Sequence, residues 1–166
     1  PGSFTTPSNV NNGGSNFVLT QLQLTGNSSN TGGALTVTGD ALAFQYNAGT
    51  APRIVNSPNG TQKPALTISN NIVVASGTLE TGNGTLFLSG TSTFTGDLLI
   101  QRAPSGGGVV LTGDALLGSG GTFTGNVLTT STTTLALSYQ SSQTQTITGT
   151  IYGGGSAGTI TSVEVN

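Results

Sequence analysis

The sequence contains no cysteine, histidine, methionine or tryptophan. Without cysteine the chain can form neither a disulfide framework nor a CxxC metal or redox motif, and the redox compartment cannot be inferred from thiols. Without histidine it lacks the commonest general base and the commonest metal ligand. The side chains most often used in catalysis and metal binding are therefore missing.

Charged residues are scarce as well, with three Lys or Arg against five Asp or Glu and a net charge of −2. This charge is too small to favour nucleic acid or an acidic membrane surface as a partner. No apolar run approaches the ~18 residues of a membrane helix, so we expect no membrane insertion by this segment. The charged start and apolar centre of a signal peptide are lacking too. Long-range charge thus does not select the partner.

The first three residues, Pro1, Gly2 and Ser3, look like the scar of a protease-cleaved fusion tag. We set 1–3 aside as an expression remnant for this reason. At 166 residues the chain fits one domain. A repeat protein can end at any coil and still look like one domain. Because the chain begins with an apparent tag scar, we interpret 4–166 as a single repetitive segment excised from a longer protein.

Most of the chain consists of short runs in which apolar residues alternate with Thr, Ser or Gln. A period of two is typical of strands with one buried face. Glycine at 27 positions argues against helices, since each interior Gly costs ~1 kcal/mol relative to Ala there. Strands are predicted in 19–26, 34–44, 64–74, 85–90, 108–118, 134–138, 144–152 and 159–165. The predicted inward pairs are Leu22 and Leu24, Leu35 and Val37, Leu66 and Ile68, Leu86 and Leu88, and Leu135 and Leu137.

Short words recur along the chain at irregular intervals. "TGDAL" occurs at 38–42 and 112–116, and "TFTGD" at 93–97 is echoed by "TFTGN" at 122–126. Runs that recur roughly every 15 to 30 residues are typical of a solenoid with variable loops. A β-sandwich is the alternative, but its core normally draws on more large aromatics and does not repeat its own words. We therefore predict an all-β solenoid of roughly six to eight coils, at about 20 to 25 residues per coil.

The segment 82–100, "GNGTLFLSGTSTFTGDLLI", resembles the autotransporter-associated β-strand repeat of bacterial passenger domains. Two positions depart from the pattern, with Ser92 in place of Asn and Phe94 in place of Tyr. A weaker similarity covers 142–156. The resemblance implies a right-handed parallel β-helix, a location at the bacterial surface or outside the cell, and often an adhesin. The motif residues are Gly82, Gly84, Thr85, Leu86, Leu88, Gly90, Thr93, Phe94, Thr95 and Gly96.

Three aspartates, Asp40, Asp97 and Asp114, each follow a Thr-Gly step. Stacked in a row they would suit calcium or acid catalysis, yet they are isolated in sequence, whereas calcium wants six to eight oxygens. Asp at the turn after a strand commonly bonds its own backbone, and we favour this interpretation. We therefore expect no catalytic residue, no metal site and no cofactor. Together with Arg53, Lys63 and Arg102, the acids could form a cleft like that of a polysaccharide lyase. Because the chain has so few charges, we favour the interpretation that these three cations lie in solvated loops.

The stretch 47–64 interrupts the alternation with Pro52, Pro58 and Pro64 and holds two of the three cations. Proline cannot donate to a strand ladder, so we expect this stretch to leave the coil as a loop. Loops on a rigid scaffold often carry binding residues. The candidate binding residues are Tyr46, Arg53 and Lys63.

Three classes of function are left open by these observations. The first, which we favour, is a non-enzymatic, adhesin-like structural module that is secreted or at the cell surface. It would associate weakly with itself, and a glycan or protein receptor is its expected partner. The second is a carbohydrate-binding or carbohydrate-processing β-helix. The third is an ice-binding or crystal-binding surface, for which the Thr-x-Thr spacing is too irregular.

Overall fold

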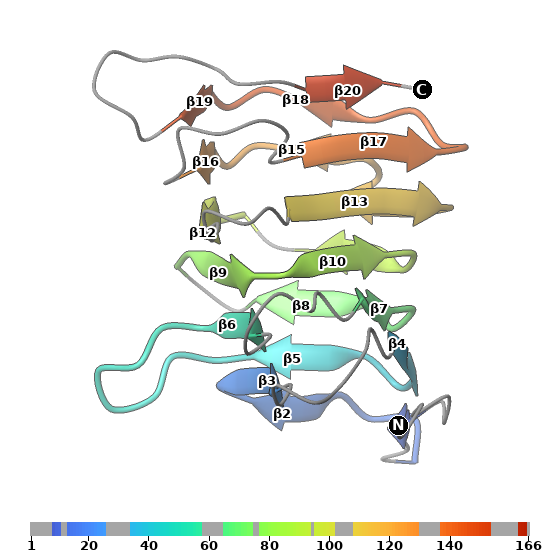
Figure 1. Ribbon diagram of the computed structural model, residues 1–166, viewed down its shortest axis with the longest axis vertical. Coiled ribbons are helices and arrows are strands. Elements are labelled where there is room, and N and C mark those ends of the chain that lie inside the picture. Colours follow the sequence, from blue (N-terminus) through green and yellow to red (C-terminus); the bar gives the residue numbers. More distant parts are fainter. Residues whose placement is uncertain are drawn as a thin grey trace.

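A computed structural model describes residues 8–10, 13–25, 34–57, 65–74, 77–93, 95–101, 108–129, 137–153 and 163–165. Residues 1–3, interpreted above as an expression remnant, and Lys63, Phe94, Arg102 and Leu135 lie outside the described residues. The described residues contain strands and turns but no helix, and hence no helix that could cross a membrane. Figure 1 shows the strands stacked along the longest axis, with β1 and β20 at opposite ends.

Three parallel sheets form the sides of the molecule. Sheet A holds β1 (Ser8–Val10), β4 (Ala34–Gly39), β7 (Ala65–Ile68), β10 (Thr85–Leu88), β13 (Gly108–Gly113), β17 (Leu137–Ser141) and β20 (Val163–Val165). Sheet B holds β2 (Phe17–Leu19), β5 (Leu42–Phe44), β8 (Ile72–Val74), β11 (Thr91–Thr93) and β14 (Leu116–Leu117). Sheet C holds β3 (Gln21–Thr25), β6 (Arg53–Ser57), β9 (Leu79–Asn83), β12 (Leu98–Gln101), β16 (Val127–Thr129) and β19 (Ile151–Gly153). A fourth pair joins β15 (Thr122–Phe123) to β18 (Thr146–Ile147).

The chain visits the sheets in the order A, B, C and then returns to A beside its previous strand. We number the coils by their strands: coil 1 is β1–β3, coil 2 β4–β6, coil 3 β7–β9, coil 4 β10–β12, coil 5 β13–β16 and coil 6 β17–β19. In the described part of the chain, coils 1 to 5 each place a strand in all three sheets. The predicted parallel β-solenoid is confirmed, with fewer complete three-sided coils than expected. The alternative, a β-sandwich, is wrong, because the described strands wind in turn through three parallel sheets.

The core is built from columns of identical or similar side chains that stack from coil to coil. In sheet A, Leu66, Leu86 and Val109 lie in register, and so do Ile68, Leu88 and Leu111. Leu86 and Leu88 are buried, whereas Phe87 between them is partly exposed. This is the predicted register, and it follows from the period of two, because a slip of one residue would turn every apolar side chain outward.

Each motif glycine that lies between strands sits at one corner of coil 4. Gly84 joins sheet C to sheet A, Gly90 joins A to B, and Gly96 joins B to C. A Cβ atom added to any of them would meet the coil below, at 2.4 Å from Asn56 Nδ2, 2.3 Å from the Asn70 oxygen and 1.7 Å from the Gly77 oxygen, respectively. Gly90 and Gly96 are therefore required by close approach of the backbone, whereas Gly84 leaves room for the side-chain amide of Asn56.

The repeated words mark two different corners. "TGDAL" at 38–42 and 112–116 lies between sheets A and B, whereas "TGD" at 95–97 lies between sheets B and C. "TFTGD" and "TFTGN" also end at equivalent positions, because Asp97 and Asn126 occupy the same corner one coil apart. The five-residue words thus mark equivalent corners, whereas the shorter Thr-Gly-Asp step occurs at both corners and does not by itself give the position in the coil.

Ser92, the position at which the motif usually has Asn, faces the core. It lies in register between Ile72 and Leu117, is buried, and its Oγ has no hydrogen-bond partner. A buried hydroxyl without a partner costs about 1–3 kcal/mol. Replacing Ser92 by alanine is therefore expected to raise the free energy of unfolding by about 1 kcal/mol, measured by urea denaturation.

The matched control for this change is Ser89→Ala. Ser89 lies on the outside of the same coil and its Oγ is 2.9 Å from Ser69 Oγ. Its loss is expected to leave the free energy of unfolding nearly unchanged or slightly lower, because an exposed hydrogen bond adds little. A Ser92→Ala protein that is less stable than Ser89→Ala would contradict the assignment of an unpartnered hydroxyl.

The expectation that 47–64 forms one long loop is wrong in part. The residues Arg53–Ser57 are strand β6, paired with β3 on one side and β9 on the other. The alternation cannot be recognised in the sequence of this strand, because the polar Asn56 lies at an inward, buried position. The apolar Val55 lies on the outer side of the strand. Pro52 directly precedes the strand, where its missing N–H does no harm and its carbonyl accepts from Glu80 N.

Candidate functional site on the outer face of sheet C

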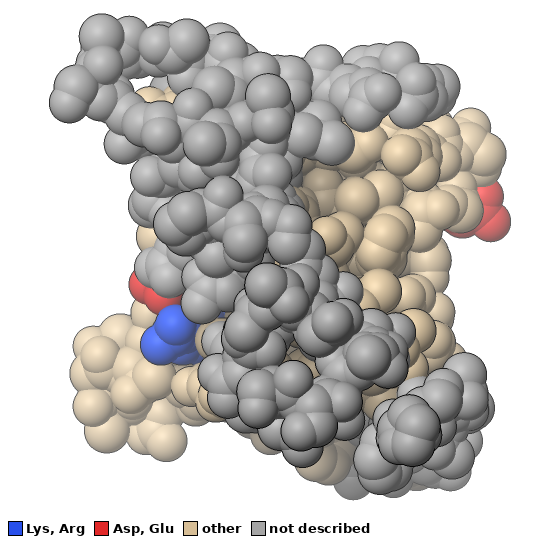
Figure 2. Space-filling model, in the orientation of Figure 1, with Lys and Arg blue, Asp and Glu red and all other residues tan. Residues whose placement is uncertain are grey.

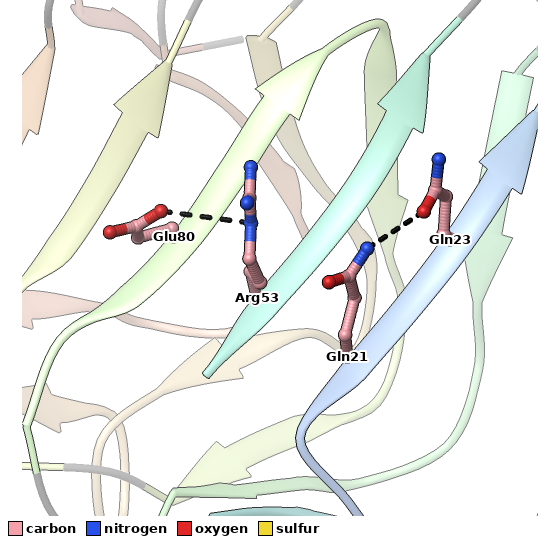
Figure 3. A network of polar contacts seen from close by, with 4 residues as sticks. All are labelled: Gln21, Gln23, Arg53 and Glu80. Carbon is pink, nitrogen blue, oxygen red and sulfur yellow. Dashed lines mark hydrogen bonds and ion pairs between the residues drawn. The ribbon is translucent and has the colours of Figure 1, made fainter. Parts of the chain in front are cut away.

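Polar side chains from three successive coils lie together on the outer face of sheet C (Figure 3). Gln21 of β3, Arg53 of β6 and Glu80 of β9 are in register, so they form one column across the strands. Gln23 lies two residues further along β3 and accepts a hydrogen bond from Gln21, with Nε2 and Oε1 2.8 Å apart. We call Gln21, Gln23, Arg53 and Glu80 the glutamine–arginine face.

Arg53 and Glu80 form an ion pair, with Nε and Oε2 3.7 Å apart. Their side chains remain 35% and 24% exposed. A partly exposed pair of this kind contributes little to stability. It does place opposite charges in adjacent coils, where two like charges would repel. Among the described residues on the visible face, Figure 2 shows small patches of charge.

Coil 2 carries an insertion next to this face. One residue, Thr20, connects β2 to β3 in coil 1, whereas 45–52 connects β5 to β6 in coil 2. This longer connection projects from the body at the lower left of Figure 1. Its two ends are held close together, since Gln45 N donates to Leu19 O and Arg53 N donates to Thr20 O. The insertion therefore leaves and rejoins the coil beside the glutamine–arginine face.

The tip of the insertion is a tight two-residue turn. Asn47 and Thr50 exchange backbone hydrogen bonds at 3.2 and 2.8 Å, and Ala48 and Gly49 between them both have positive φ, 45° and 88°. Two positive φ values are typical of the type I′ turn. Tyr46, 62% exposed, precedes the turn, with its hydroxyl 3.9 Å from where a Cβ on Gly49 would lie. The ring is thus presented to solvent on a defined support.

The structure places two of the three predicted binding residues on coil 2. Tyr46 lies in the insertion, as expected, whereas Arg53 is part of strand β6 and is paired with Glu80 and not free in a loop. Lys63 lies outside the described residues. Sequence reasoning missed Gln21, Gln23 and Glu80. Their outward positions follow from the alternation with Leu22, Leu24 and Leu79, and that signal could have identified them.

The aspartates are not gathered into a row. Asp40 and Asp114 lie at the corner between sheets A and B in coils 2 and 5, and Asp97 lies at the corner between sheets B and C. Among the described residues there is no group of three acidic side chains that could hold a metal ion. No two of these three carboxylates lie at the same corner in adjacent coils, so the arrangement offers no carboxylate row for calcium.

Each aspartate instead accepts hydrogen bonds from a neighbouring coil. Asp40 Oδ2 is 3.1 Å from Gly14 N, and Asp97 Oδ1 is 2.8 Å from Asn126 N. Asp114 Oδ1 accepts from Ser142 Oγ at 2.6 Å and from Gln143 Nε2 at 3.0 Å. The favoured interpretation, a bond to the residue's own turn, misses these contacts. These carboxylates link one coil to the next.

The links at Asp114 predict a dependence of stability on pH. Hydrogen bonds from Ser142 and Gln143 to the ionised carboxylate hold the pKa of Asp114 below its ordinary value of 3.8. The unfolded chain has the ordinary pKa, so this contribution is fully present above about pH 4. It is lost as the pH falls through the lower pKa of the folded protein.

The measurement is the melting temperature of the wild type and of Asp114→Asn from about pH 5 to about pH 2.5. The wild-type advantage is expected to be small, because the side chain is exposed, and to shrink as the pH falls. A difference between the two proteins that is constant over this range, or that grows on acidification, would show that these hydrogen bonds do not favour the ionised form.

A glutamine closes the edge of sheet B at coil 5. Gln145 accepts from Leu117 N at 2.7 Å and donates to Leu117 O at 3.0 Å and to Gly121 O at 2.9 Å. The amide side chain thereby satisfies backbone groups that a further strand would otherwise pair. Sheet B stops at β14 for this reason, and coil 6 continues through β18 instead.

Comparison with known proteins adds no family to this description. No protein-family model matches the chain, and neither the curated proteins nor the solved structures give a match. The resemblance of 82–96 to the autotransporter-associated repeat therefore stays a prediction from the sequence.

Proposed function

We propose that this chain is a non-enzymatic structural module of an extracellular or cell-surface protein of the autotransporter passenger type. It acts as an adhesin-like rod that contacts its partners through its flat sides. The observation that carries the proposal is the use of its aspartates, since Asp40, Asp97 and Asp114 each bind a neighbouring coil. Carboxylates held between coils serve the scaffold, and among the described residues the outer faces carry mainly hydroxyl and amide groups, with Arg53 and Glu80 paired to each other.

The location is tested by labelling intact, unpermeabilised cells of the source organism with an antibody against this segment. We expect intact cells to be labelled as strongly as permeabilised cells. Labelling that requires permeabilisation would contradict a surface location.

Turnover of polysaccharides or glycosides by the purified chain would contradict the non-enzymatic role, and Asp97→Asn is the variant that would show whether such turnover belongs to this chain.

Weak self-association is the second part of the proposal. The core residues that remain partly exposed lie almost entirely in the end coils, namely Leu19, Leu22, Leu24, Leu35, Tyr139, Ile147 and Ile151. In coil 1 the edge strand β2 also exposes Phe17 and Val18, 45% and 56%. Edge strands with apolar side chains favour pairing with another chain. With so few charges the faces provide little repulsion between two rods.

Sedimentation across concentration, at low and high salt, measures this association. We expect a concentration-dependent shift to larger species that salt changes little. Val18→Lys, which puts a charge on the edge strand, is expected to weaken end-to-end association. Thr93→Lys is the matched control, because Thr93 is exposed on the outer face of the same sheet in coil 4. If only Thr93→Lys weakens association, the rods associate side by side. A strict monomer, or association that disappears at high salt, would contradict the proposal.

A further inference from the structure

The glutamine–arginine face presents planar polar groups in a fixed arrangement. The two glutamine amides both donate and accept hydrogen bonds, the Arg53 guanidinium donates, and the Glu80 carboxylate accepts. All four stand on strands that are hydrogen-bonded into sheet C, so their backbone positions are defined. Figure 3 shows the glutamine pair and the ion pair side by side on neighbouring strands. Such a surface suits a ligand with many hydroxyl groups, each of which both donates and accepts.

The charges of this face select a neutral ligand. Arg53 and Glu80 are paired with each other, so their charges cancel locally. Arg53 Nε is buried and makes no hydrogen bond, although the side chain as a whole is 35% exposed. The exposed part of Arg53 therefore lies elsewhere on the side chain and can contact a ligand. An anionic ligand would be repelled by Glu80 as well as attracted by Arg53.

Tyr46 adds an exposed aromatic residue on the insertion, which rejoins the coil at Arg53. The residue is 62% exposed, and its hydroxyl lies 3.9 Å from the Cβ position of Gly49 in the type I′ turn. An exposed tyrosine supplies a large contact area at a low cost in conformational entropy. Its apolar face matches the C–H face of a sugar ring, while its hydroxyl can bond to a sugar hydroxyl.

The extent of the face also suits a linear chain. Adjacent coils are ~4.8 Å apart, so a column over three coils spans about 10 Å. The spacing between adjacent coils is close to the length that one pyranose ring adds to an extended glycan. The polar column ends one coil further on, where Leu99 is in register with Glu80. The polar column is thereby confined to coils 1 to 3.

We propose that the glutamine–arginine face and Tyr46 together bind a neutral, hydroxyl-rich glycan that lies across coils 1 to 3. This inference rests on the proposed function, because it assigns a ligand class to a module that acts by adhesion. It places the binding site on the side of the rod and not at its ends. Association of the rods with one another therefore does not depend on it.

Calorimetric titration with cellohexaose, chitohexaose, maltohexaose and xylohexaose tests the proposal, with hexagalacturonate as the acidic comparison. We expect at least one neutral probe to bind with a dissociation constant below about 1 mM. Tyr46→Ala is expected to weaken that binding about tenfold, and the double change Gln21→Ala with Gln23→Ala about threefold or more. Gln140→Ala is the matched control, because Gln140 is exposed on sheet A, away from this face. The Gln140→Ala protein should bind the neutral probe with the same affinity as the wild type.

Three results would overturn the glycan site. They are no heat of binding with any neutral probe, binding that Tyr46→Ala leaves unchanged, and binding of hexagalacturonate at least as tight as that of the neutral probes. Circular dichroism and melting curves of the variants show whether a loss of binding reflects unfolding. Side-chain amide NMR signals of Gln21 and Gln23 should shift with the bound probe and give a readout that stability does not affect. If these tests fail while cell labelling and sedimentation give the expected results, only the glycan site is wrong.

Discussion

Alanine in place of Gly96 is expected to lower the free energy of unfolding by about 3 kcal/mol or more. The added Cβ would lie 1.7 Å from the Gly77 oxygen and 2.6 Å from the Gly77 carbonyl carbon. These atoms belong to the backbone of the coil below, so no side chain can rotate away. The corner must open, and this would disturb the hydrogen bond between Leu79 N and Asp97 O.

The same corner recurs in the next two coils. A Cβ on Gly125 would lie 2.0 Å from Gly96 O, and one on Gly149 would lie 2.1 Å from Gly125 O. The effect of Gly96→Ala is measured by urea denaturation. Gly120→Ala is the control, because Gly120 has a positive φ of 58° but nothing within 4 Å of its Cβ position. It should cost only about 1–2 kcal/mol of backbone strain. Equal costs at Gly96 and Gly120 would show that coil contact is not what requires glycine at Gly96.

Truncation of Leu88 to alanine is expected to cost about 2–5 kcal/mol, the usual range for a buried leucine. Leu88 is 1% exposed and lies in register between Ile68 and Leu111. The cavity would be bounded above and below by paired strands, which cannot move together without breaking their ladder. Relaxation is therefore limited, and the cost should fall in the upper part of this range.

Phe87→Ala is the matched change on the opposite side of the same strand. Phe87 is in register with Thr67 and Val110 and is partly exposed. Its loss should cost clearly less than the loss of Leu88, although phenylalanine is the larger side chain. Both values come from chemical denaturation of the same preparation. A larger cost for Phe87 would mean that the inward and outward faces of β10 have been exchanged.

The alternation in the sequence predicted the faces of the strands well, and it failed where single residues broke the pattern. It predicted Leu86 and Leu88 inside and Phe87 outside, because in a strand successive side chains point to opposite sides. It missed β6, since Asn56 is buried at an inward position. It also gave no warning that Ser92 faces an apolar column. One polar residue at an inward position is enough to hide a strand of five residues.

The candidate site was less predictable than the fold. Tyr46 was found because prolines and glycine mark the insertion, but the residues that accompany it come from three coils. The coils differ in length, since Ser69 and Ser89 are 20 residues apart while Asp40 and Asn70 are 30 apart. A sequence without a constant repeat length therefore gives no rule for which side chains become neighbours. The pairing of Arg53 with Glu80 follows only from the register of β6 with β9.

By itself the sequence determined the all-β class, the inward face of most strands and the poverty in chemically reactive groups. These properties depend on residue type and on the period of two, both of which are local. Only the tertiary structure decided which corner each Thr-Gly step occupies and which coil each aspartate holds. It also decided that Gln21, Arg53 and Glu80 share one column. The physical reason is that register between parallel strands is set by packing and hydrogen bonding across coils, whereas connections that vary from Thr20 alone to 45–52 leave it undetermined along the chain.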